Sequence, residues 1–321
     1  MASPKNKTQK SESQKQNQSA KSQCFIFEDR AQRLDVFLSY CAEGYSRSII
    51  QKIIKEGRVL VNGKKQLKPS FELEEGDTAE VFWPSEEQNK IVLKDLIIFE
   101  NKDFFVINKP AGLLVHPQSS AWENNPQAVY CADDTIVSAV LSSPPKGFDA
   151  SLPRLGLVHR LDRETSGVML IAKNKEFQQA ALQMFAERQM YKTYLALCCG
   201  AVPDKEGAID VPIGRLAGGK IKAGELGRSA LTVYKRLKTN GKFSLMELYP
   251  KTGRTNQLRV HMAWLGYPVL GDWLYKGASA PRLMLHALRL EFKHPFINKD
   301  FCFEVKPPKD FKEALKLCFG K

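Results

Sequence analysis

The sequence predicts an α+β protein with a small N-terminal domain and a larger C-terminal domain. Two helical patterns followed by a hairpin pattern occupy residues 29–83. Residues 84–94 are a polar connection, which is typical of a linker between domains. From residue 95 to residue 321, short apolar and alternating segments predict many strands and few helices. The chain has 321 residues, 43% of them hydrophobic, which suffices for one large core and a small second domain.

The net charge indicates the class of partner. Lys and Arg number 48 against 35 Asp and Glu, which gives a formal net charge of +13. Such a surplus favours a polyanion, most often nucleic acid, although a generally basic protein is the alternative. No apolar run approaches the ~20 residues that span a bilayer, and no apolar segment follows the N-terminal lysines as in a secretory signal. We therefore expect a cytoplasmic protein that does not bind membranes.

The sequence has no motif for a metal or an organic cofactor. Its seven cysteines are scattered without a Cys-x-x-Cys pair, as in a protein with reduced thiols. No cluster of Cys and His has the spacing of a zinc site. The glycines between residues 218 and 227 lack the spacing of a Walker loop, so no nucleotide cofactor is expected.

The N-terminal domain begins after a basic tail. Residues 1–23 contain no aliphatic or aromatic side chain after Met1 and are expected to be disordered, either adding non-specific RNA affinity or only solubility. Leu34, Phe37 and Leu38 then have helical spacing. A second helix is predicted from Arg47 to Glu56, because Ser46 is a suitable N-cap and Gly57 a suitable stop.

A hairpin is predicted next, with Asn62-Gly63 as its turn. The ordered strings Arg-Leu-Asp-x-Phe-Leu, Ser-Arg and Gly-Arg-Val-Leu-Val-Asn-Gly resemble the S4 RNA-binding domain. The resemblance implies binding through phosphates and the shape of the RNA helix. For the lysines alone, a solvated surface is the simpler explanation. The expected RNA-binding side chains of this domain are Arg47, Lys52, Lys55, Arg58, Lys64 and Lys65.

The central stretch of the C-terminal domain runs from Gly156 to Ala172. Its polar half predicts a loop, Thr-Ser-Gly a turn, and its apolar half a buried strand. Asp162 lies in the loop between Arg160 and Arg163, where a rigid strand could hold it for chemistry. From spacing alone, an acid neutralised by its neighbouring arginines is the better explanation.

The string His-Arg-Leu-Asp-x-x-Thr-Ser-Gly resembles the catalytic motif of the RluA family of pseudouridine synthases, and Asp162 matches the catalytic aspartate. The resemblance covers about two thirds of the chain. Lys109 to Pro117 resembles the first motif of the family, which supports the catalytic loop, so Lys109 and His116 are expected to be structural. Residues 118–154 are poorly patterned and predict a surface excursion with a short helix over 135–141.

Two further motifs follow in family order. After a predicted helix over 175–189, Lys-x-Tyr-x-Ala places Tyr194 at the position of the active-site tyrosine. In Thr252 to Met262, Leu258 matches the residue that lines the base pocket, and Arg259 matches the arginine that pairs with the aspartate. Thr255 and Gly266 are suitable ends for a helix here. Asn256 stands where many members have His, and His286 is expected to be a core residue.

The resemblance implies a mixed, mainly antiparallel sheet and an isomerase that converts uridines of structured RNA into pseudouridine. The base would be flipped out of its stack, with Arg160 contacting RNA and without any cofactor. Asp162 could attack covalently or act as a general base. The S4 domain indicates the RluD-like branch, and hence large-subunit ribosomal RNA or pre-ribosomal particles, modified by a monomer. Transfer RNA, a non-catalytic assembly factor, and glycosidic hydrolysis with Glu164 as second carboxylate are the alternatives.

Overall fold

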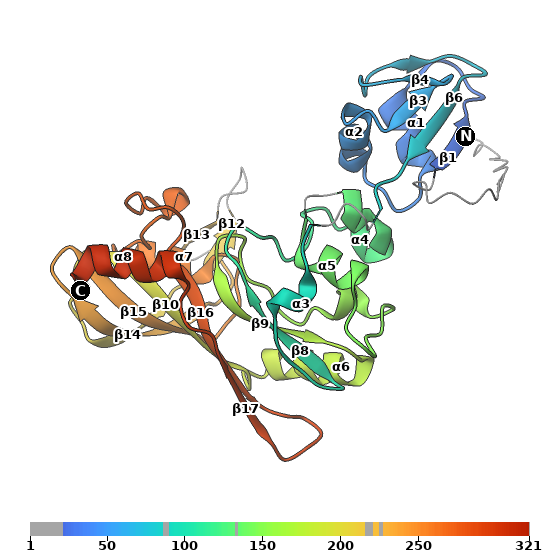
Figure 1. Ribbon diagram of the computed structural model, residues 1–321. Coiled ribbons are helices and arrows are strands. Elements are labelled where there is room, and N and C mark those ends of the chain that lie inside the picture. The colour runs from blue at the N-terminus through green and yellow to red at the C-terminus, as the bar shows by residue number, and fades with distance from the viewer. Residues whose placement is uncertain (1–21, 86–89, 132–133, 216–220, 225–226, 321) are drawn as a thin grey trace. The chain divides into compact units, whose positions relative to one another are not determined.

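The computed structural model describes residues 22–85, 90–131, 134–215, 221–224 and 227–320. The chain forms two compact units (Figure 1). The first comprises residues up to 91 together with 116–142, and the second comprises 92–115 and 143–321. In the described ranges, no helix is long and apolar enough to cross a lipid bilayer.

The first unit contains the expected pair of helices and hairpin. Helix α1 buries Leu34 and Leu38, and α2 buries its four isoleucines. The Ser46 side chain accepts a hydrogen bond from the Ile49 amide at 3.5 Å, which confirms the predicted N-cap. The elements are β1 (Ser22–Ile26), β2 (Gln32–Arg33), α1 (Leu34–Cys41), α2 (Arg47–Lys55), β3 (Val59–Val61), β4 (Lys64–Lys65), β5 (Glu72–Leu73) and β6 (Thr78–Phe82).

Two strand pairings define this unit. A four-stranded sheet has the order β1-β6-β3-β4, and β2 pairs with β5. Asn62 and Gly63 join β3 to β4 with φ of 50° and 74°, the left-handed conformation that a two-residue hairpin turn requires. Of the predicted basic tail, residues 1–21 lie outside the described part of the chain. Residues 22 and 23 belong to β1, which the sequence did not predict.

The segment 116–142 is not the surface excursion that the sequence predicted. Trp122, Val129 and Val140 are almost completely buried, so the segment is packed into the first unit. The Ser119 hydroxyl donates to the Ser46 hydroxyl at 3.4 Å, beside the start of α2. The short helix predicted over 135–141 is confirmed as α5. The elements are α4 (Ala121–Asn124), η2 (Pro126–Cys131) and α5 (Ile136–Ser142).

The second unit is built on a nine-stranded sheet. Eight of its strands follow the order β11-β14-β15-β10-β16-β9-β8-β7, and the ninth, β17, pairs with β16. The β16–β9 pair is parallel and the other pairs are antiparallel, which confirms the expected mixed sheet. The strands are β7 (Ile97–Glu100), β8 (Phe104–Lys109), β9 (Ser166–Ala172), β10 (Tyr191–Cys199), β11 (Glu206–Asp210), β14 (Leu231–Thr239), β15 (Phe243–Pro250), β16 (Leu285–Lys293) and β17 (Asp300–Glu304).

Helices pack on this sheet and short pieces connect its strands. Helix α6 packs on β9, and α7 packs on β14 and β15. Strands β12 and β13 form a separate ribbon, and the glycine-rich loop around it lies partly outside the described residues. The remaining elements are α3 (Leu93–Leu96), η3 (Pro153–Gly156), α6 (Lys175–Ala186), β12 (Ile213–Arg215), β13 (Ile221–Ala223), α7 (Gln257–Trp264), η4 (Trp273–Tyr275) and α8 (Lys309–Phe319).

The catalytic-loop motif folds as predicted, into a loop followed by the fully buried strand β9. The structure explains why the motif has glycine at position 167. Gly167 has φ of +119°, and a Cβ there would lie 2.1 Å from the Ala287 carbonyl oxygen. Only glycine allows the backbone of β9 to approach β16 this closely.

Two predicted helix ends were wrong. Helix α6 ends at Ala186 and not at residue 189, because Arg188 adopts the left-handed conformation with φ of 61°. Helix α7 begins at Gln257, and its N-cap position is occupied by Asn256, with φ of 55°, rather than by Thr255. Gly266, with φ of +91°, ends this helix as expected.

Candidate active site

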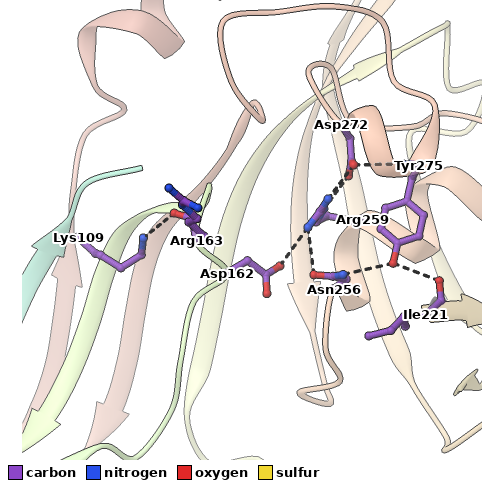
Figure 2. Close-up of polar contacts among 8 residues, drawn as sticks. All are labelled: Lys109, Asp162, Arg163, Ile221, Asn256, Arg259, Asp272 and Tyr275. Atoms are coloured by element: carbon purple, nitrogen blue, oxygen red, sulfur yellow. Dashed lines mark hydrogen bonds and ion pairs between the residues drawn. The ribbon is translucent and has the colours of Figure 1, made fainter. Parts of the chain in front are cut away.

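The catalytic loop is pinned by a buried lysine. Lys109 donates from Nζ to the carbonyl oxygens of Pro110, Leu113 and Arg163 at 2.8, 2.8 and 3.0 Å. Figure 2 shows it reaching the backbone of the catalytic loop. Burial lowers the pKa of Lys109 to about 7, against the attraction of Glu164 and Asp162. The segment Lys109–Pro117 therefore supports the loop, as its resemblance to the first motif implied.

The catalytic loop and the Lys109 segment are also joined through their backbones. The Gly112 amide donates to the Arg163 carbonyl at 2.9 Å, and Arg163 Nε donates to the Gly112 carbonyl at 3.0 Å. His116 belongs to the other unit, where its Nδ1 lies 2.7 Å from the Pro117 carbonyl oxygen. These contacts of Lys109 and His116 are with backbone carbonyl oxygens, which agrees with the structural roles expected of both residues.

Arg259 faces Asp162 across the site (Figure 2). Its Nη1 lies 4.0 Å from Asp162 Oδ2, which is the predicted ion pair at the outer limit of such a contact. The shorter contacts of Arg259 are to Asp272, whose two carboxylate oxygens accept from Nε and Nη2 at 2.7 and 2.8 Å. The side chain of Asp272 is fully buried. A two-pronged pair of this kind holds the guanidinium plane in one orientation.

Asn256 continues this network. Its Oδ1 accepts from Arg259 Nη1 at 3.1 Å, and its Nδ2 donates to the Tyr275 hydroxyl at 3.3 Å. That hydroxyl donates in turn to the Ile221 carbonyl at 3.1 Å (Figure 2). Asn256 thus orients Arg259 from the side opposite Asp272. Asn256, which stands where many family members have His, therefore accepts a hydrogen bond from the arginine that faces Asp162.

A pocket of about 130 Å³ brings the predicted residues together. Tyr194 lines it from β10, at a register shift between Thr193 and Tyr194 in the pairing with β16. Such a bulge re-aims the side chain that follows it. The lining includes Arg160, Asp162, Tyr194, Leu258 and Arg259, together with Lys192 and residues 252–256.

Charges and burial act in opposite directions on the Asp162 carboxyl, which keeps 25% of its surface exposed. Burial raises its pKa above the ordinary value, although the positive charges of Arg259, Arg160 and Lys109 oppose the rise. The pKa of the Tyr194 phenol is also raised, by burial and then by the charge of Asp162. The phenol is therefore neutral and can donate a hydrogen bond.

Sequence reasoning missed two members of the site, Asp272 and Lys192. Asp272 follows Gly271 and belongs to no recognisable motif. It contacts Arg259 because the segment after α7 folds back against that helix. Lys192 was seen only as part of the Lys-x-Tyr string, yet it lines the pocket. Burial lowers its pKa to about 8. Among the described residues, no group of three or more His, Cys, Asp and Glu could hold a metal ion.

The candidate RNA-binding residues of the first unit have different surroundings. Arg47 donates from Nε and Nη2 to the buried carboxylate of Asp35 at 3.1 and 3.0 Å, so it has a structural role in addition to any RNA contact. Lys52 and Arg58 both lie within 4 Å of Glu56, at 3.8 and 3.5 Å. Lys55, Lys64 and Lys65 are exposed. In the second unit, Arg160 is exposed at the pocket.

Residues 103–264 match the family model of RNA pseudouridylate synthases, and residues 32–78 match the S4 domain. The chain belongs to the RNA pseudouridylate synthase family. An uncharacterized RNA pseudouridine synthase of Aquifex aeolicus is 38% identical, over 90% of this chain and 95% of the relative. Ribosomal large subunit pseudouridine synthase D of Xanthomonas campestris is 34% identical, over 88% of each chain.

Solved structures agree. Human RNA Pseudouridylate Synthase Domain Containing 1 is 29% identical with a TM-score of 0.52, over 69% of this chain and 86% of that chain. Human RNA Pseudouridylate Synthase Domain Containing 4 is 27% identical with a TM-score of 0.53, over 70% and 94%. The family assignment confirms the predicted isomerase, which converts uridine in RNA into pseudouridine, and the predicted α+β fold with an S4 domain.

Proposed function

We propose that this enzyme modifies specific uridines of bacterial large-subunit ribosomal RNA, with Asp162 as its catalytic carboxylate. The ribosomal substrate is supported by the relative from Xanthomonas campestris and by the S4 domain. The observation that carries the catalytic assignment is Asp162 in a pocket with Tyr194, Leu258 and Arg259. The enzyme would act as a monomer in the cytoplasm, where ribosomal particles are assembled.

The reaction is an isomerisation at one nucleotide. The target uridine is flipped out of its stack at a cost of a few kcal/mol, which basic contacts to the RNA offset. The bond between ribose and the uracil nitrogen breaks, the base turns, and a carbon of the base bonds to the ribose. The proton on that carbon leaves and the released nitrogen gains one, so that no atom is added overall.

Asp162 serves this reaction by one of two routes. As a nucleophile it attacks the sugar or the base and forms a covalent intermediate. As a general base it removes a proton from the ribose. Both routes need the ionised carboxylate with an oxygen free to react. Arg259 stabilises that charge from 4.0 Å, while Asp272 and Asn256 occupy its closer hydrogen bonds.

Tyr194 and Leu258 form the walls that receive the flipped base. Tyr194 is 9% exposed and Leu258 is 6% exposed, so both are held rigidly by the packing around them. The Tyr194 ring can stack on the base, and its neutral hydroxyl can donate to a carbonyl oxygen of uracil. A flipped base would thus meet one aromatic, one aliphatic and one acidic side chain in this pocket.

The test compares the parent with Asp162→Asn on large-subunit RNA from cells that lack the enzyme, with pseudouridine mapped by carbodiimide stops. We expect specific stops with the parent and none with the variant, which should still bind the RNA. Equal modification by both proteins would refute the role of Asp162. Modification of transfer RNA alone would refute the ribosomal substrate. Tight binding without modification of either RNA would favour an assembly factor.

A further inference from the structure

A second hollow lies beside the uridine pocket. Its volume is about 550 Å³, which is within the range of sites that bind small molecules. It is continuous with the uridine pocket, because Arg160, Lys192, Tyr194, Pro250, Thr252 and Gly253 line both. We call it the flanking groove. Its other walls come from the turn after α6, from β10, from the segment after β15, and from β16.

The flanking groove is strongly basic. Five cationic side chains and a single acidic one line it: Arg160, Arg188, Lys192, Lys251, Arg289 and Glu291. The Arg289 guanidinium already pairs with Glu304 at 2.6 Å. His159 adds no charge, because burial lowers its pKa to about 3 and its Nε2 accepts from the Leu170 amide at 2.9 Å. The balance of charge therefore favours an anion in the groove.

Lys192 lies where the groove meets the uridine pocket. Its Nζ lies 5.6 Å from the centre of the Phe185 ring. Within the described ranges, no carboxylate is in ion-pair contact with it, in contrast with Arg259 and Arg289. A half-buried ammonium without an acidic partner is costly, and the cost falls when a phosphate binds there.

Aromatic side chains supply a second kind of contact. Tyr191 lines the groove and leaves 58% of its surface exposed, so the face of its ring is accessible to a ligand. Tyr249 and Phe185 also line it. Phosphate-binding cations beside exposed rings are the combination by which proteins hold single-stranded nucleic acid, since bases stack on the rings.

We propose that the flanking groove binds the nucleotide next to the flipped uridine, with Lys192 on the phosphate between the two nucleotides and Tyr191 stacked on the neighbouring base. The inference rests on the proposed function, because it takes the uridine pocket as the place of the target base. A second extruded nucleotide makes the sequence around the uridine part of recognition. Arg188 and Lys251 bind the next phosphate, on the far side of the neighbouring nucleotide.

The experiment combines a change in the protein with a change in the RNA. Synthetic hairpins carry the uridine identified by mapping, with the base deleted from either neighbouring nucleotide. Dissociation constants and single-turnover rates are measured for the parent and for Tyr191→Ala. Stacking contributes about 1–3 kcal/mol per base. Tyr191→Ala and deletion of the one neighbouring base that stacks on Tyr191 should therefore each weaken binding about 10-fold. The two changes together should weaken it no further than one alone.

The control is Phe296→Ala, because Phe296 is 55% exposed in the β16–β17 connection and does not line the groove. It should leave the sensitivity to base deletion unchanged. Lys251→Ala provides a second measurement, since loss of one phosphate contact should reduce the salt slope of binding by about one. A parent that tolerates deletion of both neighbouring bases, or losses that multiply in the combined experiment, would overturn the proposal.

Failure of the proposed function has a different appearance. If the parent forms no pseudouridine in any RNA, the binding measurements continue with a hairpin that has an all-uridine loop. The flanking groove is then tested by dissociation constants alone, with the same deletions and variants. Loss of modification with a retained dependence on the neighbouring base refutes the proposed function only.

Discussion

Two carboxylates of this protein lie close to arginines, and their pKa values are shifted in opposite directions. Asp35, in the first unit, is fully buried and accepts hydrogen bonds from Arg33, Arg47 and Gln51 at 2.6–3.1 Å. Burial opposes its ionisation, but these hydrogen bonds outweigh burial and lower its pKa to about 2. Asp162, in the second unit, keeps 25% of its surface exposed and has a raised pKa.

The difference lies in where the arginine's hydrogen bonds go. Arg33 and Arg47 donate directly to Asp35, so that both carboxylate oxygens of Asp35 accept hydrogen bonds. Arg259 donates to Asp272 and Asn256, and contributes to Asp162 only its charge, from 4.0 Å. A nearby arginine alone does not distinguish a structural carboxylate from a reactive one. What distinguishes Asp162 is that a second acid takes the arginine's short contacts.

Replacement of Asp162, the proposed catalytic carboxylate, should have the largest effect. Asp162→Asn should lower the single-turnover rate by about 10⁴-fold, because the group that attacks or removes a proton is lost. The free energy of unfolding should not fall, since a carboxyl with a raised pKa destabilises the folded state when it is ionised. Rates come from pseudouridine formation and stability from urea unfolding. Parallel loss of activity and stability would make Asp162 a structural residue like Asp35.

Replacement of the structural carboxylate should show the reverse pattern. Asp35→Ala removes the acceptor of Arg33, Arg47 and Gln51 and should cost about 2 kcal/mol of unfolding free energy, as expected for a carboxyl whose pKa is lowered to about 2 on folding. In the parent this stability is present above the unfolded pKa of about 3.9 and is lost as the pH falls toward 2. Unfolding of the parent and the variant should therefore converge at low pH. A constant difference between pH 7 and pH 2 would contradict the assignment.

Arg259→Met should sharpen the comparison further. Loss of the charge opposite Asp162 should lower the rate by about 10²-fold and should move the acidic limb of the pH–rate profile to higher pH, because the arginine holds the pKa of Asp162 down. The measurement is the single-turnover rate between pH 5 and pH 9. An unchanged acidic limb would show that the rate loss came from altered packing alone.

Asp272→Asn should have the smallest effect and the opposite sign on pH. Loss of a fixed orientation for Arg259 should lower the rate about 10-fold. The acidic limb should move to lower pH, since the charge of Asp272 raises the pKa of Asp162. Asp272→Glu is the matched control, because it keeps the charge. We expect Asp272 to position Arg259, and a shift in the same direction as Arg259→Met would contradict that role.

Much of the local structure could be predicted because it depends on residues close together in the chain. Ser46 caps α2, Asn62-Gly63 turns the hairpin, and residues 166–172 form a buried strand. The same holds for the loop that contains Asp162, whereas a catalytic role for Asp162 was implied only by the resemblance of its motif to the RluA family. These features arise from backbone preferences and hydrophobic periodicity, which act over a few residues.

Only the tertiary structure decided which partners these residues have. Asp272 against Arg259, Arg47 against Asp35, and Lys192 between two pockets all depend on strand order and burial. The packing of residues 116–142 into the first unit, with Trp122, Val129 and Val140 buried, is of the same kind. Charged side chains look alike in a sequence, because type and spacing do not say which hydrogen bond a guanidinium makes. The fold determines that choice, and with it which of the two aspartates has its carboxylate oxygens occupied by an arginine.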